Sequence, residues 1–432
     1  MIGQVSQQKT SEPSKTPASR TPQKKIALIC TAYRERYHAD VIATKFFYGF
    51  PTDDGVVRPR VKVVSMYIDQ TNPDDLGLKI AARYNVPIYP TVTGALTLGG
   101  KKLAVDAVLF IGEHGDYPFN RFGMEMYPRL RIAEEIFRCF DASKRVVPVF
   151  HDKHLSYSWL DSKWIYDRSR ELKAPYMAGS SLPLTWRNPP LEHPIGSKIS
   201  EAVALGYGDS MDAYGFHVLE ILQCMLERRA GGETGVASVQ YLRADAMFAA
   251  ARQGAFSMDL AEAAASTIDI KQKGTMRQHA RDPVAIIVKY RDGTKGTVLM
   301  MYRYYGLRWA YAARVNGKIV ATEFLLQDEL VDNKRTPKCH FSYLGLNAEE
   351  MFVTGKPLYA VERTLLTSGI LDMAHRSRAA GGKVIETPFL DVRYKPLEIK
   401  AIRPSGAKPS GASLMRWPPN ELKSLYRTQA KH

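Results

Sequence analysis

The amino-acid sequence predicts an α/β protein with an N-terminal doubly wound parallel sheet and a C-terminal α+β region whose open sheet is mostly antiparallel. Between residues 26 and 180, short apolar runs alternate with helical segments, a pattern typical of doubly wound parallel sheets. Beyond residue 180, longer runs rich in β-branched and aromatic residues are separated by turn residues, which favours antiparallel strands. The two patterns together predict two sheets of different kinds in one chain.

The N-terminal sheet is expected to form from short apolar runs bounded by polar residues, which are typical of buried parallel strands. These runs occupy residues 26–30, 61–69, 86–89, 105–112, 146–150 and 176–180. Helices are predicted between them at residues 36–48, 76–84, 129–140 and 158–172.

The C-terminal region shows two turn signals between strand-like runs. Residues 284–290 and 294–301 flank an Arg-Asp-Gly turn, which predicts a hairpin. Residues 314–315 and 318–324 flank Asn316-Gly317 and predict a second strand pair. A long helix over residues 360–380 should end at Gly381-Gly382, because glycine commonly terminates helices.

Length and charge indicate two domains with basic ends. A chain of 432 residues exceeds one ordinary core. We predict a disordered tail over 1–24, a parallel-sheet domain over 25–180, an α+β domain over 181–395 and a basic extension over 396–432. Much of the formal net charge of +16 lies in the two ends, which we expect to be flexible, and the chain has no zinc-finger, RNA-recognition or basic-zipper pattern. Nucleic acid is therefore not an expected partner.

The cysteines and the N-terminus bear on the cellular compartment. Cys30, Cys139, Cys224 and Cys339 are widely spaced, which predicts buried free thiols in a reducing compartment rather than disulfides. The N-terminus lacks the apolar segment of a signal peptide, and no apolar run is long enough to span a membrane. We therefore expect a cytoplasmic protein without a membrane partner.

Five segments, in the correct order, resemble those of the Gfo/Idh/MocA oxidoreductases. They are KIALICTAYRERYHAD, a strand ending in Asp69 with the later YNVPIY, RVVPVFHDKH, DAYGFHVLE, and the closing TGKPLYAVERTLLTSGILDMAHRSRAAGGKVIETP. The resemblance covers roughly residues 25–395. It implies a Rossmann-like nucleotide-binding domain followed by a substrate and oligomerisation domain, and an oxidoreductase that uses NAD or NADP on a hydroxyl of a sugar, polyol or related carbohydrate. It also implies a homo-oligomer.

The loop after the first strand departs from the family pattern. A Rossmann loop uses three glycines for a tight turn, for backbone approach to the pyrophosphate and for packing. Cys30, Ala32 and Glu35 occupy those positions. Glu35 would place negative charge near the phosphates, whereas Arg34 and Arg36 could offset it. A loop that packs and binds no dinucleotide is an equal alternative.

By resemblance, the cofactor-binding candidates are Thr31, Ala32, Arg34, Asp69, Glu113 and His114. Asp69 ends the second strand, where an acidic residue bonds a ribose hydroxyl and prefers NAD to a 2′-phosphorylated cofactor. An ordinary strand-end carboxylate is the alternative. Glu113 and His114 stand where the family has a neutral loop beside the nicotinamide.

By resemblance, the catalytic candidates are Lys153, His217 and Asp212. Lys153 in His-Asp-Lys-His matches the lysine of the family's Glu-Lys-Pro, and His217 matches the histidine of Gly-x-His. A lysine here can donate to the reacting oxygen. The family aspartate lies four residues before the histidine, at the position of Ala213, so that Asp212 fits only if a local bulge restores its direction.

A divalent metal site competes with the redox interpretation. Strand-end loops of a doubly wound sheet converge on one crevice. The carboxylates and imidazoles that could meet there are Glu113, His114, Asp116, His151, Asp152, His154, His217 and Glu220. Their spacing matches no fixed zinc motif, so that a hydrogen-bonded cluster without metal is the alternative.

Two further functions therefore stand beside the oxidoreductase. One is a lyase or hydrolase, either metal-assisted or dependent on acid–base groups, that acts on a carbohydrate-like substrate without a dinucleotide. The other is a ligand-binding protein without turnover. The altered glycine loop favours both, whereas the Lys153–His217 pair favours catalysis over binding alone.

Overall fold

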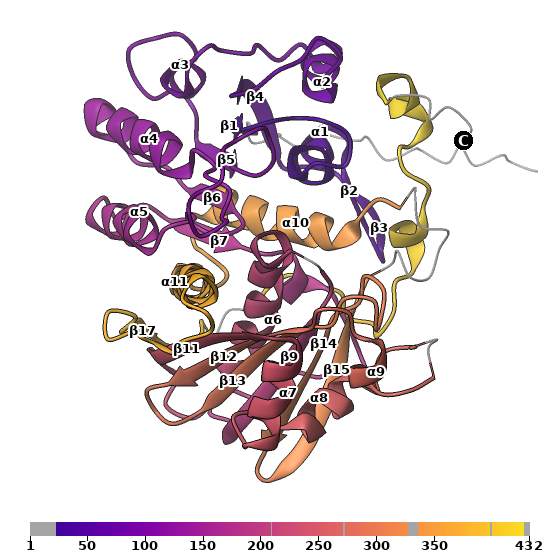
Figure 1. Ribbon diagram of the computed structural model, residues 1–432. Helices are drawn as coiled ribbons and strands as arrows, with labels where there is room; N and C mark the ends of the chain where they lie inside the picture. Colours follow the sequence, from indigo (N-terminus) through magenta and orange to yellow (C-terminus); the bar gives the residue numbers. More distant parts are fainter. Residues whose placement is uncertain (1–22, 209, 271–272, 327–335, 398–399, 427–432) are drawn as a thin grey trace, which may run out of the picture.

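The structure is a computed structural model that describes residues 23–208, 210–270, 273–326, 336–397 and 400–426 (Figure 1). Its first sheet contains β1 (Lys24–Cys30), β4 (Val61–Ile68), β5 (Ala107–Ile111), β6 (Val149–Asp152) and β7 (Tyr176–Gly179). These strands are parallel and follow the order β4-β1-β5-β6-β7. The predicted doubly wound parallel sheet is confirmed. The predicted tail over 1–24 lies outside the described residues, except for Gln23 and for Lys24, which begins β1.

One predicted strand is wrong. Residues 86–89 form no strand, and only an isolated bridge joins Ile88 to Met66 beside β4. Pro87 and Pro90 explain this, since proline has no backbone N–H to donate to a neighbouring strand.

Helices cover both faces of this sheet. One face carries α3 (Val92–Thr97), α4 (Arg129–Ser143) and α5 (Trp159–Glu171), as the contacts among these helices and with β1 and β4 show. The other carries α1 (Thr44–Tyr48) with the π-helical turn η1 (Ala39–Ala43), α2 (Leu76–Tyr84) and α10 (Cys339–Thr354). Successive β1 residues alternate between the two cores: Ala27 and Ile29 face one, and Ile26 and Leu28 face the other.

The second sheet has the order β16-β11-β12-β13-β9-β14-β15-β8. Its strands are β8 (Trp186–Asn188), β9 (Ile199–Gly206), β11 (Val236–Arg243), β12 (Val284–Tyr290), β13 (Lys295–Met300), β14 (Ala310–Val315), β15 (Lys318–Leu325) and β16 (Ile385–Glu386). Every neighbouring pair is antiparallel except β13 and β9. Both predicted strand pairs and the mostly antiparallel sheet are confirmed.

Two helices connect this sheet to the first. The inner face of the second sheet carries α6 (Phe216–Leu226) and α11 (Val361–Ala379), whereas α7 (Ala244–Arg252) and α8 (Met258–Ala265) cover the outer face (Figure 1). The short helix α9 (Met276–His279) lies near α8. Since α11 also contacts β7 and α5, the region between the sheets is a packed core. The domain division at residue 180 stays a prediction.

The remaining short strands pair locally. Strands β2 (Phe50–Thr52) and β3 (Gly55–Val57) form a hairpin, and β10 (Glu233–Thr234) pairs with β17 (Arg393–Tyr394).

The C-terminal extension is ordered over residues 400–426, contrary to the prediction of a flexible end. It contains the 3-10 turns η6 (Gly411–Leu414) and η7 (Asn420–Leu425), and it runs beside α1, β2 and β3 (Figure 1). Leu422 is fully buried, and Tyr426 donates a hydrogen bond to Asp40 at 2.5 Å. A basic composition misled the prediction, because a few apolar and aromatic side chains suffice to anchor the segment.

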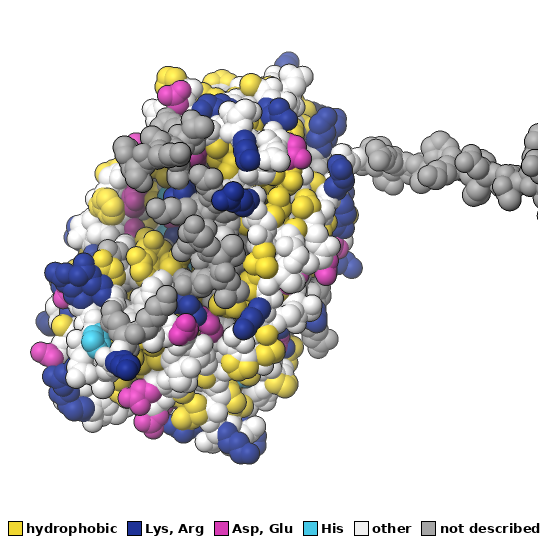
Figure 2. Space-filling view, turned by 90° about the vertical axis from the view of Figure 1, so that its right-hand side faces the viewer, with side chains coloured by type: hydrophobic (Ala, Val, Ile, Leu, Met, Phe, Trp, Pro, Cys, Tyr) yellow, Lys and Arg dark blue, Asp and Glu magenta, His cyan; other side chains and the backbone are white. Residues whose placement is uncertain are grey.

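Three further observations concern thiols, membranes and charge. All four cysteines are buried and free, as predicted. Within the described residues, no helix is both long and apolar enough to cross a membrane. On the face shown in Figure 2, the Lys and Arg side chains that are visible are scattered among other residues rather than gathered in one patch.

Candidate functional site

The candidate site lies at the carboxyl edge of the first sheet, where β1, β5 and β6 end side by side. Their registers pair Cys30 with Ile111 and Phe110 with His151, so the loops after these strands are neighbours. The Thr31 hydroxyl fastens two of them by donating to the Glu113 carbonyl oxygen at 2.9 Å. This edge is where doubly wound proteins bind ligands.

A buried ion-pair cluster formed by Glu113, Lys153 and Arg129 is the centre of the site. The Lys153 Nζ lies 2.8 Å from Glu113 Oε1, and the Arg129 guanidinium donates to Glu113 Oε2. Burial by itself would raise the pKa of the Glu113 carboxyl, but Lys153 and Arg129 outweigh it and hold that pKa well below its ordinary value. Glu113 is therefore a fixed negative charge between two cations.

Lys153 is held in an uncommon backbone conformation. Its φ is +67°, in the left-handed region that side chains other than glycine seldom adopt. Its backbone N–H donates to Gly179, and its Nζ also donates to the Ala213 carbonyl at 2.8 Å. Lysine has three N–H donors, and Glu113 and Ala213 take two of them. The strained backbone thus aims a buried ammonium between the sheet and the start of α6.

His217 belongs to a hydrogen-bonded row that crosses from α6 to the loop after β7. Its Nδ1 lies 2.7 Å from the Ser180 hydroxyl, and the Ser180 N–H donates to Glu220 at 3.4 Å. Burial, reinforced by Lys153, lowers the pKa of the His217 imidazole well below its ordinary value. His217 is therefore neutral at pH 7 and can accept a proton.

Glu220 is a buried carboxyl that carries its proton near neutrality. It is fully buried, accepts from the hydroxyls of Thr367 at 2.7 Å and Thr364 at 3.4 Å, and interacts with the Ser180 N–H. Burial raises the pKa of Glu220 to about 7. It turns toward α11 and supports the His217 row.

His38 and Asp152 form a second pair beside the cluster. The His38 Nδ1 lies 2.5 Å from Asp152 Oδ2, while Asp152 Oδ1 is buried without a hydrogen-bond partner. The His38 ring lies 5.2 Å from the His114 ring and 6.2 Å from the His217 ring, between their centroids. His38 therefore occupies the space between the β1 loop, the β5 loop and α6.

Asp212 lies on a π-helical turn, η3 (Met211–Gly215), directly before α6. A π turn holds one more residue than an α turn, which is the local bulge that would bring Asp212 to the direction of the family aspartate. Its Oδ2 accepts from the Glu125 N–H at 2.9 Å, and its Oδ1 lies 4.0 Å from the His375 Nε2. Burial raises the pKa of the Asp212 carboxyl. Its nearest partners are thus Glu125 and His375 rather than His217.

The loop of residues 31–38 does not fit a dinucleotide in this structure. Side chains stand at all three glycine positions, and Cys30 and Ala32 are fully buried. Tyr33 is also fully buried, and its hydroxyl pairs with Thr44 at 2.8 Å. The Tyr37 ring stacks on His114, with centroids 4.4 Å apart. A side chain thus fills each place where a Rossmann loop brings its bare backbone to the pyrophosphate.

Arg34 and Asp69, two further cofactor-binding candidates, form ion pairs and hydrogen bonds with other residues of the protein. Arg34 Nε lies 3.2 Å from Asp75, and its guanidinium lies 3.9 Å from Asp116. Asp69 accepts from the Tyr117 hydroxyl at 2.7 Å, from the Tyr67 hydroxyl and from Arg131. Burial opposes ionisation, but these donors outweigh it and lower the pKa of Asp69. Asp69 is a tied strand-end carboxylate.

His114 has a left-handed φ of +70° and lies against the Tyr37 and His38 rings. Burial, reinforced by His38, lowers the pKa of its imidazole to about 3. The ring is neutral and is sandwiched against Tyr37.

The predicted meeting of eight acidic and imidazole groups does not occur. His151 turns away and lies 2.9 Å from the Tyr176 hydroxyl, and His154 Nε2 accepts from Arg129 at 2.8 Å. Asp116 is exposed, and Glu220 faces α11. Among the described residues, no group of three or more His, Cys, Asp or Glu side chains could hold a metal ion. The metal hypothesis therefore has no support in this geometry.

Three residues of the site escaped the sequence analysis: Arg129, His38 and Ser180. Arg129 had a signal that went unused. It is the first residue of α4, where a cation opposes the helix dipole and so needs a specific partner. That partner is Glu113. His38 and Ser180 carry no comparable signal, because their roles depend on distant contacts with Asp152 and His217.

Comparisons with known proteins concern the fold. No protein-family model matches the sequence, and no curated protein matches it. Among solved structures, GenD2 from gentamicin A biosynthesis in complex with NAD is similar, with a TM-score of 0.55 and 12% identity over 87% of this chain and 99% of that one. Myo-inositol 2-dehydrogenase from Lactobacillus plantarum has a TM-score of 0.52 and 12% identity, over 84% of this chain and 99% of that one.

Scyllo-inositol dehydrogenase from Lactobacillus casei, in its apo form, has a TM-score of 0.53 and 8% identity, over 85% of this chain and 99% of that one. Identities this low speak for the fold alone. This fold similarity agrees with the order of elements, the parallel first sheet and the open second sheet. The chain has the fold of the Gfo/Idh/MocA-type dehydrogenases.

Proposed function

We propose that the protein is an enzyme that performs acid–base chemistry at a hydroxyl-bearing carbon of a sugar, polyol or related carbohydrate. The observation that carries this proposal is the buried Lys153 ammonium, fixed between Glu113 and the Ala213 carbonyl at the carboxyl edge of the first sheet. A buried charge held by a strained backbone is costly, and such features concentrate at functional sites.

The cluster supplies a proton donor and a proton acceptor. Glu113 and Ala213 accept two of the three N–H groups of Lys153. The third N–H would donate to a substrate oxygen and stabilise negative charge there. His217 is neutral and would accept a proton, with Ser180 orienting its ring. Arg129 keeps Glu113 ionised, and the Glu113 carboxylate fixes the position of the Lys153 Nζ.

The geometry favours a reaction without a dinucleotide. The Tyr33 and Tyr37 side chains of the 31–38 loop and the Asp69 carboxylate already have partners within the protein. A lyase or hydrolase needs only the proton donor and acceptor that the cluster provides. We therefore favour this class on a carbohydrate-like substrate, which the sugar and polyol dehydrogenases of the same fold suggest.

A nicotinamide-dependent oxidoreductase is the second candidate, and the NAD complex of the structurally similar GenD2 favours it. In that case NAD or NADP would accept hydride from the carbon. The stack of Tyr37 on His114 would have to open before a dinucleotide could lie across the loop. Homo-oligomerisation and a cytoplasmic location remain expectations from the sequence.

One set of reactions tests the proposal. The purified protein is incubated in D₂O with a panel of polyols, sugars and sugar acids, with and without NAD and NADP. Mass spectrometry then records deuterium uptake and loss of water, and Lys163→Met, on the surface of α5, serves as a matched control. We expect deuterium uptake or turnover without a dinucleotide, abolished in Lys153→Met.

The alternatives give different results. Turnover only with NAD or NADP would move the assignment to the oxidoreductase. No exchange and no turnover under either condition, across the panel, would contradict an enzymatic function.

A further inference from the structure

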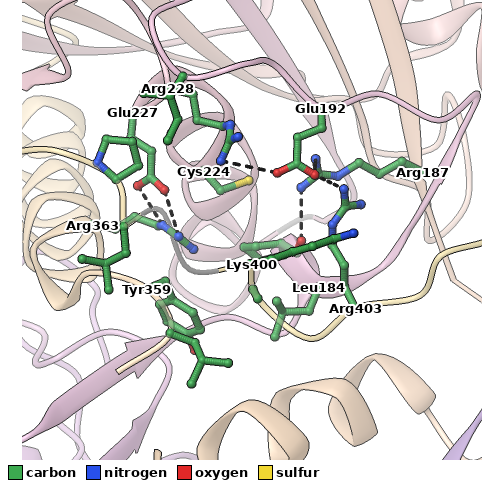
Figure 3. A pocket seen from close by; sticks show the side chains of 16 residues that line it. Leu184, Arg187, Glu192, Cys224, Glu227, Arg228, Tyr359, Arg363, Lys400 and Arg403 are labelled. Carbon is green, nitrogen blue, oxygen red and sulfur yellow. Dashed lines mark hydrogen bonds and ion pairs between the residues drawn. The ribbon is translucent and has the colours of Figure 1, made fainter. Parts of the chain in front are cut away.

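A second pocket lies at the opposite end of α6 and is surrounded by cationic side chains (Figure 3). Its volume is about 410 Å³, within the range of small-molecule sites. His217 lies in the first turn of α6, whereas Arg228 follows its last residue, and the 11 residues of the helix span about 16 Å. The pocket is therefore separate from the Lys153 cluster, and ligand binding there does not depend on the proposed function.

The charges that line the pocket are unbalanced. Three guanidinium groups share the single carboxylate of Glu192: Arg228 at 3.4 Å, Arg187 at 3.8 Å, and Arg403, which donates to it directly (Figure 3). Arg363 is neutralised separately, by two hydrogen bonds to Glu227 at 2.9 and 3.0 Å. Lys400 adds another cation. Among the described lining residues, five cations face two carboxylates.

Arg187 shows that the excess charge is built into the protein rather than spread over its surface. Its side chain is only 6% exposed, and it is fixed by hydrogen bonds to the Leu191 carbonyl at 2.9 Å and the Pro183 carbonyl at 3.3 Å. Its Nε is buried and has no hydrogen-bond partner. The guanidinium carbon lies 4.9 Å from the centre of the Phe324 ring. A buried cation is costly, and an anionic ligand in the pocket would offset its charge.

The pKa values of two arginines that line the pocket are consistent with an excess of positive charge. Burial, reinforced by Arg187, lowers the pKa of the Arg403 guanidinium to about 10. Burial likewise lowers the pKa of Arg187. Each cation is thus less stable here than in water, and an anion between them would reverse that penalty.

The apolar part of the pocket lining indicates what kind of group the anion carries. Leu184, Leu358 and Tyr359 line the pocket beside the cations. A volume of this size exceeds that of a single phosphate ion, and apolar walls suit the carbon portion of a ligand. From these observations we infer that this pocket binds the phosphate group of a small organic phosphate, through Arg187, Arg228 and Arg403.

The test is calorimetric titration of the full-length protein with three probes: inorganic phosphate, glucose 6-phosphate and glucose. Sodium chloride at matched ionic strength controls for salt. Arg403→Gln removes one guanidinium from a segment at the rim, and Lys400→Gln removes an exposed cation. Arg138→Gln, a mostly exposed arginine of α4, is the matched control. Melting curves confirm that each variant is folded.

We expect both phosphates to bind, glucose 6-phosphate more tightly, and glucose not to bind. Arg403→Gln should weaken binding by about ten-fold, the scale of one charge-assisted bond, and Lys400→Gln by about three-fold. Equal affinity for the two phosphates would support phosphate recognition with the free ion as ligand. No binding at millimolar concentration, or binding unchanged in both pocket variants, would overturn the inference.

Discussion

Two regions at the carboxyl edge of the first sheet, the Lys153 cluster and the 31–38 loop, differ in how their side chains are used. The Lys153 cluster keeps charged groups buried and tied to one another across β5, β6 and α6. The 31–38 loop, one strand away, has no glycine at its three expected positions, buries Tyr33 in the core and stacks Tyr37 on His114. The comparison teaches that the buried ion-pair cluster and the altered glycine loop can vary independently, because they sit on different loops.

The largest effect is expected at Lys153. Lys153→Met should lower turnover by roughly 10²-fold or more, the usual scale for losing an acid–base group. Lys153 is also buried and paired with Glu113. Loss of one partner of Glu113 should therefore also cost about 3–5 kcal/mol of unfolding free energy, as for any broken buried ion pair.

Steady-state kinetics and urea denaturation separate the two effects. Lys163→Met, on exposed α5, is the control and should change neither quantity. Full turnover in a folded Lys153→Met protein would remove Lys153 from the mechanism.

Arg129→Met should chiefly affect stability. Arg129 is fully buried and bridges Glu113 and His154, so its removal leaves a buried carboxylate with one cation. Breaking such a buried pair costs about 3–5 kcal/mol. Chemical denaturation measures the change, and the surface variant Arg138→Met is the control. A loss below 1 kcal/mol, roughly the worth of a surface pair, would mean that Glu113 does not depend on Arg129.

Glu220→Gln should change how stability depends on pH. Because the pKa of Glu220 is raised to about 7 in the folded protein, its contribution is complete below its ordinary value of 4.5 and is lost as pH rises to 7. The shift corresponds to about 3 kcal/mol. Unfolding free energies at pH 4.5 and pH 8 should show the variant gaining on the natural protein by this order. A pH-independent difference would place the Glu220 pKa near its ordinary value.

The smallest effect is expected at Asp69. Asp69→Asn weakens charge-assisted hydrogen bonds from Tyr67, Tyr117 and the half-exposed Arg131. Solvent screening limits the loss to about 1 kcal/mol. Thermal denaturation tests this, and nucleotide affinity should not change. A selective loss of NAD binding in the variant would restore Asp69 as a ribose ligand.

The sequence was informative where a pattern is local. Apolar runs located the strands of the first sheet, because burial on both faces demands them, and turn residues located the hairpin of β12 and β13. The strand predicted over residues 86–89 was wrong because Pro87 has no backbone N–H to donate, and an apolar pattern does not take account of this. The flexible end predicted over residues 400–426 was wrong because a basic composition does not show that Leu422 and Tyr426 anchor the segment.

The site was predictable only in part, for the same reason. Lys153, His217 and Glu113 lie on segments whose order resembles a known family. Their burial, the role of Arg129 and the diversion of His151 to Tyr176 depend on contacts between distant residues. No local spacing encodes such contacts.

The most direct test of a cofactor-free site is calorimetric titration with NAD, NADH, NADP and NADPH, accompanied by melting curves. A loop that lacks the three glycines and stacks Tyr37 on His114 predicts no heat of binding and no change in melting temperature at millimolar concentrations of any of the four. Glu35→Gly removes charge and bulk but leaves both tyrosines in place, so that this variant too should not bind. Micromolar binding of any dinucleotide to the natural protein, with a matching rise in melting temperature, would contradict a cofactor-free site and assign the protein to the oxidoreductases.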